Sequence, residues 1–252
     1  MNKLNRIVSA FALSFAAVAA QAAPAPVNNI VLVHGFFADG SGWRGVADIL
    51  ARDGFNVTVV QQSETSLADD VKATTQAVNA LDGRSILVGH SYGGVVITEA
   101  GNDAKVAGLV YVAAFAPDAG ESLKDLVDRT PPASTGIKAT ADGHLYFDRA
   151  LFHADFAADL PAADARFMAL SQVTPAVQAA TAPVSQAAWK TRPSWAIVSK
   201  DDRTVNPELE RFMARRAGSK TVEIAGSHVA FIAHPEQVAR VIEQAAAAVG
   251  GK

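Results

Sequence analysis

The stretch Leu87–Val96, LVGHSYGGVV, places Ser91 between glycines where one apolar run ends and another begins. The run before it has the length of a buried strand, and the run after it begins a helix. So sharp a turn strains the central residue, and only nearly bare flanking residues avoid a clash of Cβ atoms. The pattern predicts that Ser91 projects its hydroxyl above the carboxyl end of a strand, where open α/β sheets bind ligands. The plainer interpretation is a glycine-rich turn whose serine only caps a helix.

Strand-like runs and helical periodicity alternate on both sides of this turn. Helices are expected to begin near residues 40, 66, 92, 206 and 235. The strand-like runs cover residues 30–35, 55–60, 85–90, 106–115, 194–200 and 221–226. This alternation predicts an α/β protein with a parallel sheet covered by helices on both faces.

The alternation stops between residues 116 and 190. This segment is rich in alanine, contains six prolines and has no strand-like run of the earlier kind. Short helices are expected around residues 123–127 and 161–173. We therefore expect residues 23–115 and 191–252 to form the core, and residues 116–190 to form an inserted helical cap; a single long irregular loop is the alternative.

Composition excludes several classes of protein. Half of the 252 residues are hydrophobic, the net charge is −3, and cysteine is absent. No basic run or stripe is present, so we expect no nucleic-acid partner. Without cysteine the chain has no disulfide, no thiol nucleophile and no cysteine for a lipid anchor.

The first residues have the layout of a secretory signal peptide. A basic head, MNKLNR, precedes fourteen apolar residues from Ile7 to Ala20, and Ala20–Ala22 form a small-x-small site. The apolar stretch is shorter than the roughly 20 residues that a spanning helix needs. We therefore expect cleavage of residues 1–22, a periplasmic or secreted protein, and no membrane anchoring after cleavage.

A serine nucleophile needs a base, and the base needs an orienting acid. For this type of turn the chain order is serine, acid, histidine. His228 follows the strand-like run at 221–226, and Asp201 and Asp202 both follow the run at 194–200. All would lie at the same sheet edge as Ser91, but spacing alone does not choose between the two aspartates. The other histidines are expected in other roles. His34 should shape the first loop, the ring of His90 should point away from the site, and His234 should cap the last helix. His144 and His153 fall in the segment between residues 116 and 190.

Two backbone N–H groups could bind a developing oxyanion. One belongs to Tyr92, directly after the serine, and the other to Phe36, in the loop after the first strand. Gly35 would let this loop turn close to Ser91. The rings of Phe36 and Phe37 would either wall a pocket or pack in the core.

Together these segments resemble the α/β-hydrolase superfamily from about Asn29 to Val249. More closely, they resemble the branch of plant methylesterases and hydroxynitrile lyases with their bacterial esterase-like relatives. The resemblance implies a six-stranded, mostly parallel sheet with an inserted helical cap, and a reaction without metal or cofactor. It also implies Ser91 as nucleophile and His228 as base, with the N–H groups of Phe36 and Tyr92 as oxyanion donors. In the segment KDDR, residues 200–203, the resemblance implies that Asp202 is the acid. The segments that carry it are VLVHGFFADGSGW, LVGHSYGG, YVAAFAPDAGES, IVSKDDRTVNPELERFM and AGSHVAFIAHPEQV.

Two departures from this branch bear on the reaction. The related lyases have a lysine where this chain has Val229 and a threonine where it has Gly35. Both differences favour hydrolysis of esters over cleavage of cyanohydrins. We therefore expect a serine carboxylesterase whose partner is a small to medium, largely apolar ester. Two alternatives stay open: another chemistry of this superfamily (carbon–carbon bond hydrolase, lactonase or cofactor-free haloperoxidase), or a ligand-binding protein with slow turnover.

Overall fold

Six parallel strands form the centre of the molecule, as the sequence predicts. The computed structural model of the protein describes residues 26–250, so the expected signal peptide at residues 1–22 lies outside the described part. The strand order is β2-β1-β3-β4-β7-β8, and every neighbouring pair is parallel. The strands are β1 (Asn29–Val33), β2 (Asn56–Val60), β3 (Ser85–His90), β4 (Val106–Val112), β7 (Ser194–Ser199) and β8 (Lys220–Ile224).

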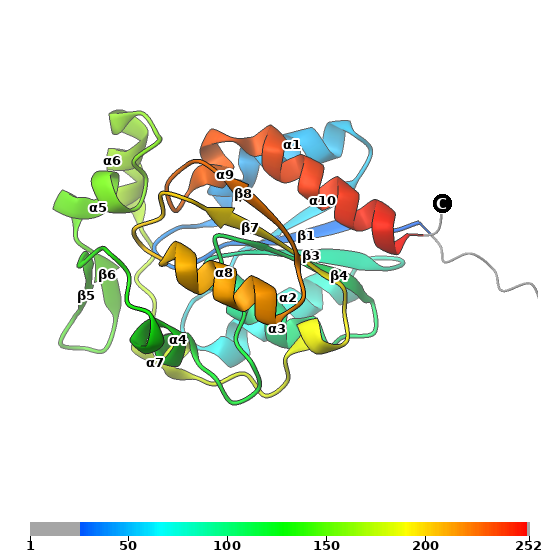
Figure 1. Cartoon of the computed structure of the whole chain (residues 1–252), viewed down its shortest axis with the longest axis horizontal. Coiled ribbons are helices and arrows are strands. Elements are labelled where there is room, and N and C mark those ends of the chain that lie inside the picture. The colour runs from blue at the N-terminus through cyan, green and yellow to red at the C-terminus, as the bar shows by residue number, and fades with distance from the viewer. Residues whose placement is uncertain (1–25, 251–252) are drawn as a thin grey trace, which may run out of the picture.

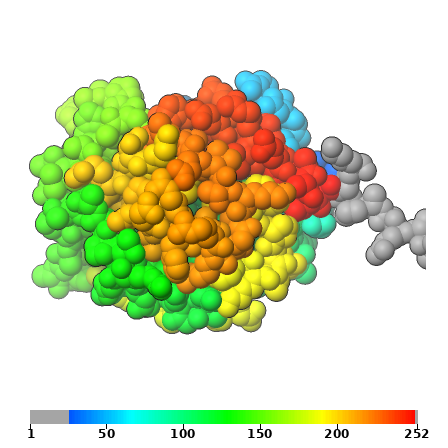
Figure 2. Space-filling view, in the orientation of Figure 1, coloured from blue at the N-terminus to red at the C-terminus, as the bar shows by residue number. Residues whose placement is uncertain are grey.

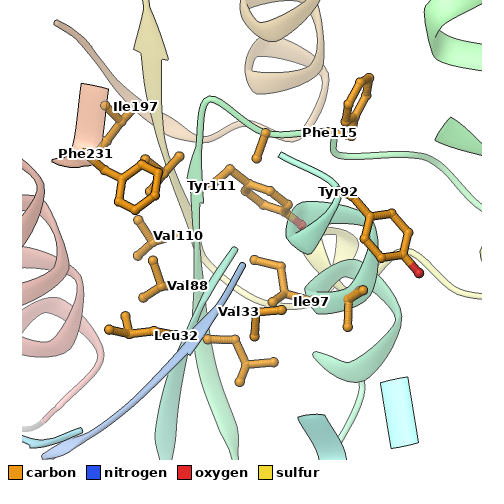
Figure 3. Close-up of a cluster of buried hydrophobic side chains, with 14 of the residues drawn as sticks. Leu32, Val33, Val88, Tyr92, Ile97, Val110, Tyr111, Phe115, Ile197 and Phe231 are labelled. Carbon is orange, nitrogen blue, oxygen red and sulfur yellow. The ribbon is translucent and has the colours of Figure 1, made fainter. Parts of the chain in front are cut away.

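The burial of each strand follows its place in the sheet. Every residue of β1, β3, β4 and β7 is buried, whereas the edge strands β2 and β8 are partly exposed. Strands that helices cover on both faces need apolar residues throughout, which is why the central runs do not alternate with polar residues. Successive side chains point to opposite faces: Leu32 and Val110 lie on one face, and Val33 and Tyr111 on the other (Figure 3).

Helices cover both faces of the sheet (Figure 1). On one face α10 contacts β3, β4 and β7 and packs against α1. On the other face α3 contacts β3 and β1 and packs against α2, while α8 contacts β7. The core helices are α1 (Arg44–Arg52), α2 (Leu67–Asn79), α3 (Gly93–Ala100), α8 (Pro207–Arg216), α9 (Ala230–Ala233) and α10 (Pro235–Val249), with the short 3-10 helix η1 (Gly40–Trp43) before α1.

The segment between β4 and β7 forms a lobe at the end of the sheet where the strands finish (Figure 1). In the space-filling view the lobe, largely green, covers the left end of the molecule (Figure 2). Two of its helices, α4 and α6, lie where the sequence predicts short helices. Its elements are α4 (Leu123–Arg129), β5 (Ile137–Ala139), β6 (Leu145–Phe147), α5 (Arg149–Asp155), α6 (Ala162–Ser171), α7 (Val177–Thr181) and the 3-10 helix η2 (Ala188–Lys190).

The lobe also contains an antiparallel pair of strands that the sequence analysis did not anticipate. Strands β5 and β6 pair from Ile137 with Phe147 to Ala139 with Leu145. Three-residue strands are too short to establish a two-residue period, so sequence patterns do not reveal them. None of the helices within residues 26–250 is both long and apolar enough to cross a membrane.

Candidate active site

Ser91 lies at the turn between β3 and α3, in backbone geometry that few residues other than glycine adopt. Its φ is 53°, in the left-handed region. The neighbouring glycines allow this turn to pack: a Cβ on Gly89 would lie 2.5 Å from the carbonyl oxygen of Gly93, and a Cβ on Gly93 would lie 2.5 Å from that of Val33. The turn therefore has the strained geometry that the sequence predicts, with Ser91 just before the N-terminus of α3.

The loop after β1 lies directly against this turn. A Cβ on Gly35 would lie 2.5 Å from the Cβ of Ser91 and 3.2 Å from its Oγ. The ring of Phe36 stacks on that of Tyr92, with centroids 3.9 Å apart. The N–H groups of Phe36 and Tyr92 donate no hydrogen bond to another group within residues 26–250. One candidate oxyanion donor, Phe36, directly follows Gly35, and the other, Tyr92, directly follows Ser91. Both N–H groups therefore remain available to a ligand.

Asp202 and His228 contact each other from the loops that follow β7 and β8. Nδ1 of His228 lies 2.6 Å from Oδ2 of Asp202, and both side chains are buried. The second oxygen of Asp202, Oδ1, accepts hydrogen bonds from the N–H groups of Thr204 and Val205, at 2.7 and 2.8 Å. With Nδ1–H donating to the carboxylate, Nε2 is left as the acceptor nitrogen of a neutral imidazole.

Asp201 lies elsewhere. Its side chain is exposed, and its Oδ2 accepts a hydrogen bond from the N–H of Gly226 at 3.1 Å. This contact joins the loop after β7 to the loop after β8 at the surface. Spacing left both aspartates open, and the fold brings only Asp202 to His228.

Nε2 of His228 is buried and has no hydrogen-bond partner within residues 26–250. His90, the residue before Ser91, connects this imidazole to the Ser91 turn. The ring centroids of His90 and His228 are 4.6 Å apart, and Nε2 of His90 lies 2.9 Å from the carbonyl oxygen of His228. No hydrogen bond joins Ser91 Oγ to Nε2 among the described residues. Catalytic hydrogen bonds are often long in ligand-free enzymes and tighten when substrate binds.

The remaining histidines have other surroundings. Burial holds the pKa of His90 well below its ordinary value, so its neutral ring packs under the site. His34 shapes the first loop as expected, because its Nδ1 lies 3.1 Å from the carbonyl oxygen of Gly35. His144 is on the lobe surface, and His153 contacts the carbonyl oxygen of Leu160. His234 is the N-cap residue of α10, as expected, but its side chain makes no capping hydrogen bond.

A buried polar network behind the first loop was not found from the sequence. Nδ1 of His34 lies 3.3 Å from Oε1 of Glu64, whose N–H donates to Oδ1 of Asp70 at 3.0 Å. The other oxygen of Asp70 accepts the hydroxyl proton of Tyr92 at 2.9 Å. The network therefore joins both candidate oxyanion loops. A polar run between a strand and a helix suggests an exposed loop, so periodicity gave no sign that Glu64 is fully buried.

Burial and mutual contact shift the pKa values of two groups in this network. Burial raises the pKa of Glu64 to about 7, against the opposing effect of His34. Burial by itself lowers the pKa of His34, but the hydrogen bond and charge of Glu64 more than compensate, and the pKa is raised. Glu64 thus titrates in the neutral range.

Glu64→Gln is expected to remove much of the decline in stability between about pH 4.5 and 7. The pKa of Glu64 is about 7 in the folded chain and ordinarily 4.5, so the folded state keeps a proton that the unfolded state loses in this window. The resulting stabilisation is complete below pH 4.5 and is lost as pH rises through 7, a change of about 3 kcal/mol. Urea unfolding of both proteins at pH 4.5, 6 and 8 measures it; parallel pH curves would contradict the assignment.

A second buried acid lies behind Asp202. Glu210, in α8, accepts a hydrogen bond from the N–H of Ser199 at 3.2 Å, and its side chain is buried. Burial, followed by the charge of Asp202, raises the pKa of Glu210 well above its ordinary value. The packing around Glu210 therefore favours its protonated form more than water would. Nothing in the amphipathic pattern of α8 distinguishes it from a surface glutamate.

Apolar side chains surround the site on the lobe side. The ring of Phe156 lies 4.9 Å from that of His228, and Phe147 and Phe152 pack against Phe156. A cleft of about 640 Å³ lies between α6, the loop after β1 and α9. Within residues 26–250, no group of three or more His, Cys, Asp or Glu side chains is arranged to hold a metal ion.

The fold and this arrangement of turn, loops and buried pair define an α/β hydrolase. A family model described as "Alpha/beta hydrolase family" matches residues 30–241, and the chain belongs to this family. This confirms the resemblance and the fold expected from the sequence.

Three known proteins are similar to this chain. A carbendazim hydrolyzing esterase from Nocardioides sp. (strain SG-4G) is 36% identical over 130 residues, which are 46% of this chain and only 54% of that esterase. The structure of a pyrethroid hydrolase from Sphingobium faniae JZ-2 is 23% identical, with a TM-score of 0.74 over 87% of this chain and 97% of the other. Polyneuridine aldehyde esterase is 16% identical, with a TM-score of 0.73 over 86% and 98% of the two chains. The two structures share the fold of this chain.

Proposed function

We propose that this protein is a serine carboxylesterase in which Ser91 is the nucleophile, His228 the base and Asp202 the acid. The observation that carries the proposal is the buried Asp202–His228 pair, which leaves Nε2 without a partner next to the strained Ser91 turn. An unpartnered imidazole nitrogen in a buried site is costly unless a ligand or a reacting group uses it. The carbendazim hydrolyzing esterase adds support, because this similar protein is named as an esterase.

The proposed reaction has two steps. His228 Nε2 takes the proton of Ser91 Oγ as the oxygen bonds to the ester carbonyl carbon. The N–H groups of Phe36 and Tyr92 hold the resulting oxyanion. The carbonyl forms again, the bond to the alkoxy oxygen breaks, and the alcohol leaves with the proton from Nε2. Water then attacks the acyl-enzyme, gives a proton to Nε2, and the acid is released as this proton returns to Ser91.

Asp202 has the orienting role in this scheme. Its Oδ2 keeps the proton of His228 on Nδ1, and its carboxylate stabilises the imidazolium that forms in each step. The N–H groups of Thr204 and Val205 fix Oδ1, so the carboxylate cannot rotate without losing two hydrogen bonds. The loop after β7 is thus built around this one carboxylate.

The surroundings of the site favour a small to medium, largely apolar ester. Phe147, Phe152 and Phe156 supply a buried apolar wall on the lobe side, next to His228. Such a wall offers no charged partner for a polyanionic substrate. A panel of p-nitrophenyl esters and of anionic esters measures this preference through kcat/KM.

Labelling with a fluorophosphonate probe tests the proposal directly. We expect mass spectrometry to find one adduct on the peptide that contains Ser91, because the probe reacts with a serine that a neighbouring base activates. His228→Ala should abolish the adduct while the protein keeps its cooperative thermal transition. An adduct on another serine, or labelling that persists in His228→Ala, would contradict the proposed pair of nucleophile and base.

A further inference from the structure

The ring of Phe37 belongs to two groups of residues. The first group is an aromatic cluster of five phenylalanines. Within it the ring centroid of Phe37 lies 6.1 Å from that of Phe36, 5.9 Å from that of Phe147 and 6.4 Å from that of Phe156. Through Phe36 the cluster reaches Tyr92, and through Phe156 it reaches His228. The cluster consists of Phe36, Phe37, Phe147, Phe152 and Phe156.

The second group lines the cleft of about 640 Å³ between the lobe and the core. The lobe supplies Leu160, Phe167 and Met168 to this lining, and the core supplies Phe231 and Ile232. Of the aromatic cluster, only Phe37 lines the cleft, and Ser91, Tyr92 and His228 do not. Ser91 is itself only 6% exposed. Phe37 is therefore the member of the aromatic cluster that borders the cleft, and the reacting groups do not border it.

The backbone of Phe37 is held in a conformation that a phenylalanine rarely adopts. Its φ is 63°, and its side chain is 2% exposed. Left-handed geometry at a bulky residue costs of order 1–3 kcal/mol and persists only where the surroundings impose it. Here the stacked and edge-on rings of the cluster fix the position of the ring. Phe37 is thus held in place as a partition rather than left free to rotate at the surface.

We propose that Phe37 is a specificity residue whose ring keeps long acyl groups out of the cleft, and that the cleft accepts a long, neutral, apolar acyl arm once this ring is removed. This inference rests on the proposed esterase function. Two carboxylates and one guanidinium, of Asp39, Asp164 and Arg44, also line the cleft, so an anionic arm is disfavoured. With the ring in place, a short acyl group fits beside Ser91, whereas a long one meets the partition.

The test compares kcat/KM for p-nitrophenyl decanoate and p-nitrophenyl acetate. Phe37→Gly removes the ring and places a glycine where φ is positive, which glycine tolerates without strain. We expect the ratio of decanoate to acetate to rise about tenfold or more, because each buried methylene adds to binding in an apolar pocket. Phe37→Leu, which keeps apolar bulk in the cluster, should raise the same ratio by less.

A second substitution tests whether the rise in the decanoate-to-acetate ratio comes from binding in the cleft. In the Phe37→Gly protein, Met168→Lys places an ammonium group in the cleft and should cancel the rise for decanoate. Val222→Lys is the matched control, because Val222 is exposed on β8 and does not line the cleft. It should leave the rise intact.

The possible outcomes separate this inference from the esterase proposal. If Phe37→Gly and Phe37→Leu both hydrolyse acetate but leave the ratio unchanged, the partition is wrong and the esterase proposal stands. If the rise survives Met168→Lys, the long arm lies outside the cleft and the subsite is wrong. Failure of the unsubstituted protein to hydrolyse any ester of the panel would instead overturn the proposed function.

Discussion

Ser91→Ala is expected to lower kcat on p-nitrophenyl acetate by between about ten thousand and a million-fold. Without Oγ no acyl-enzyme forms, and the remaining groups can only polarise the ester and orient a water molecule. The residual rate should come from the N–H groups of Phe36 and Tyr92 and from binding alone. Initial rates at saturating ester, corrected for spontaneous hydrolysis, measure the loss.

The same substitution should leave the fold intact. Ser91 Oγ makes no hydrogen bond within residues 26–250, and alanine at φ 53° carries the same backbone strain as serine. Thermal unfolding of the variant should therefore match that of the unsubstituted protein within a few degrees. A folded Ser91→Ala protein that keeps more than about one hundredth of the activity would show that another group is the nucleophile. Repeated turnover by the unsubstituted protein would also exclude a ligand-binding protein that hydrolyses its ligand only slowly.

Asp202→Asn is expected to lower kcat by about ten thousand-fold. An amide in place of the carboxylate can present its NH₂ group to Nδ1, which places the imidazole proton on Nε2. A protonated Nε2 cannot accept the proton of Ser91, and the imidazolium loses its counter-charge. The buried 2.6 Å contact between Nδ1 and Oδ2 makes this effect large, because no solvent is present to replace the carboxylate.

Asp201→Asn is the matched control on the neighbouring residue. Asp201 is exposed, and its contact with the N–H of Gly226 can also be made by an asparagine oxygen. We expect kcat to stay within about threefold of the unsubstituted value, as for most surface substitutions. Equal losses in the two variants would mean that both aspartates act on His228, contrary to the contacts described above.

Much of the fold follows from local pattern. The runs that became β1, β3, β4 and β7 are mostly apolar because helices cover both faces, and such runs are bounded clearly enough to be seen in the sequence. The lobe was less visible. Its strands β5 and β6 are three residues each, and they form through pairing with one another rather than through any period of their own. The limits of the cap and the export of the chain remain predictions.

Around the site, too, the sequence revealed some of the important residues and not others. The sequence revealed a glycine on each side of Ser91 because the turn requires it locally, and the close packing of Gly89 and Gly93 bears out that requirement. The sequence did not reveal the buried acids. Glu64 and Glu210 have ordinary polar neighbours in the chain, and only the packing of distant segments removes them from water.

The amino-acid sequence by itself determined the strands, their order along the chain and the turn that presents Ser91, because hydrophobic period and glycine sterics act over a few neighbouring residues. The resemblance to a family, rather than spacing, pointed to Asp202. The tertiary structure alone decided that His228 contacts Asp202 and not Asp201, and that Phe37 both lines the cleft and packs in the aromatic cluster. Those relations join segments far apart in the chain, and they are fixed only when the sheet edge, the loops and the lobe pack against one another.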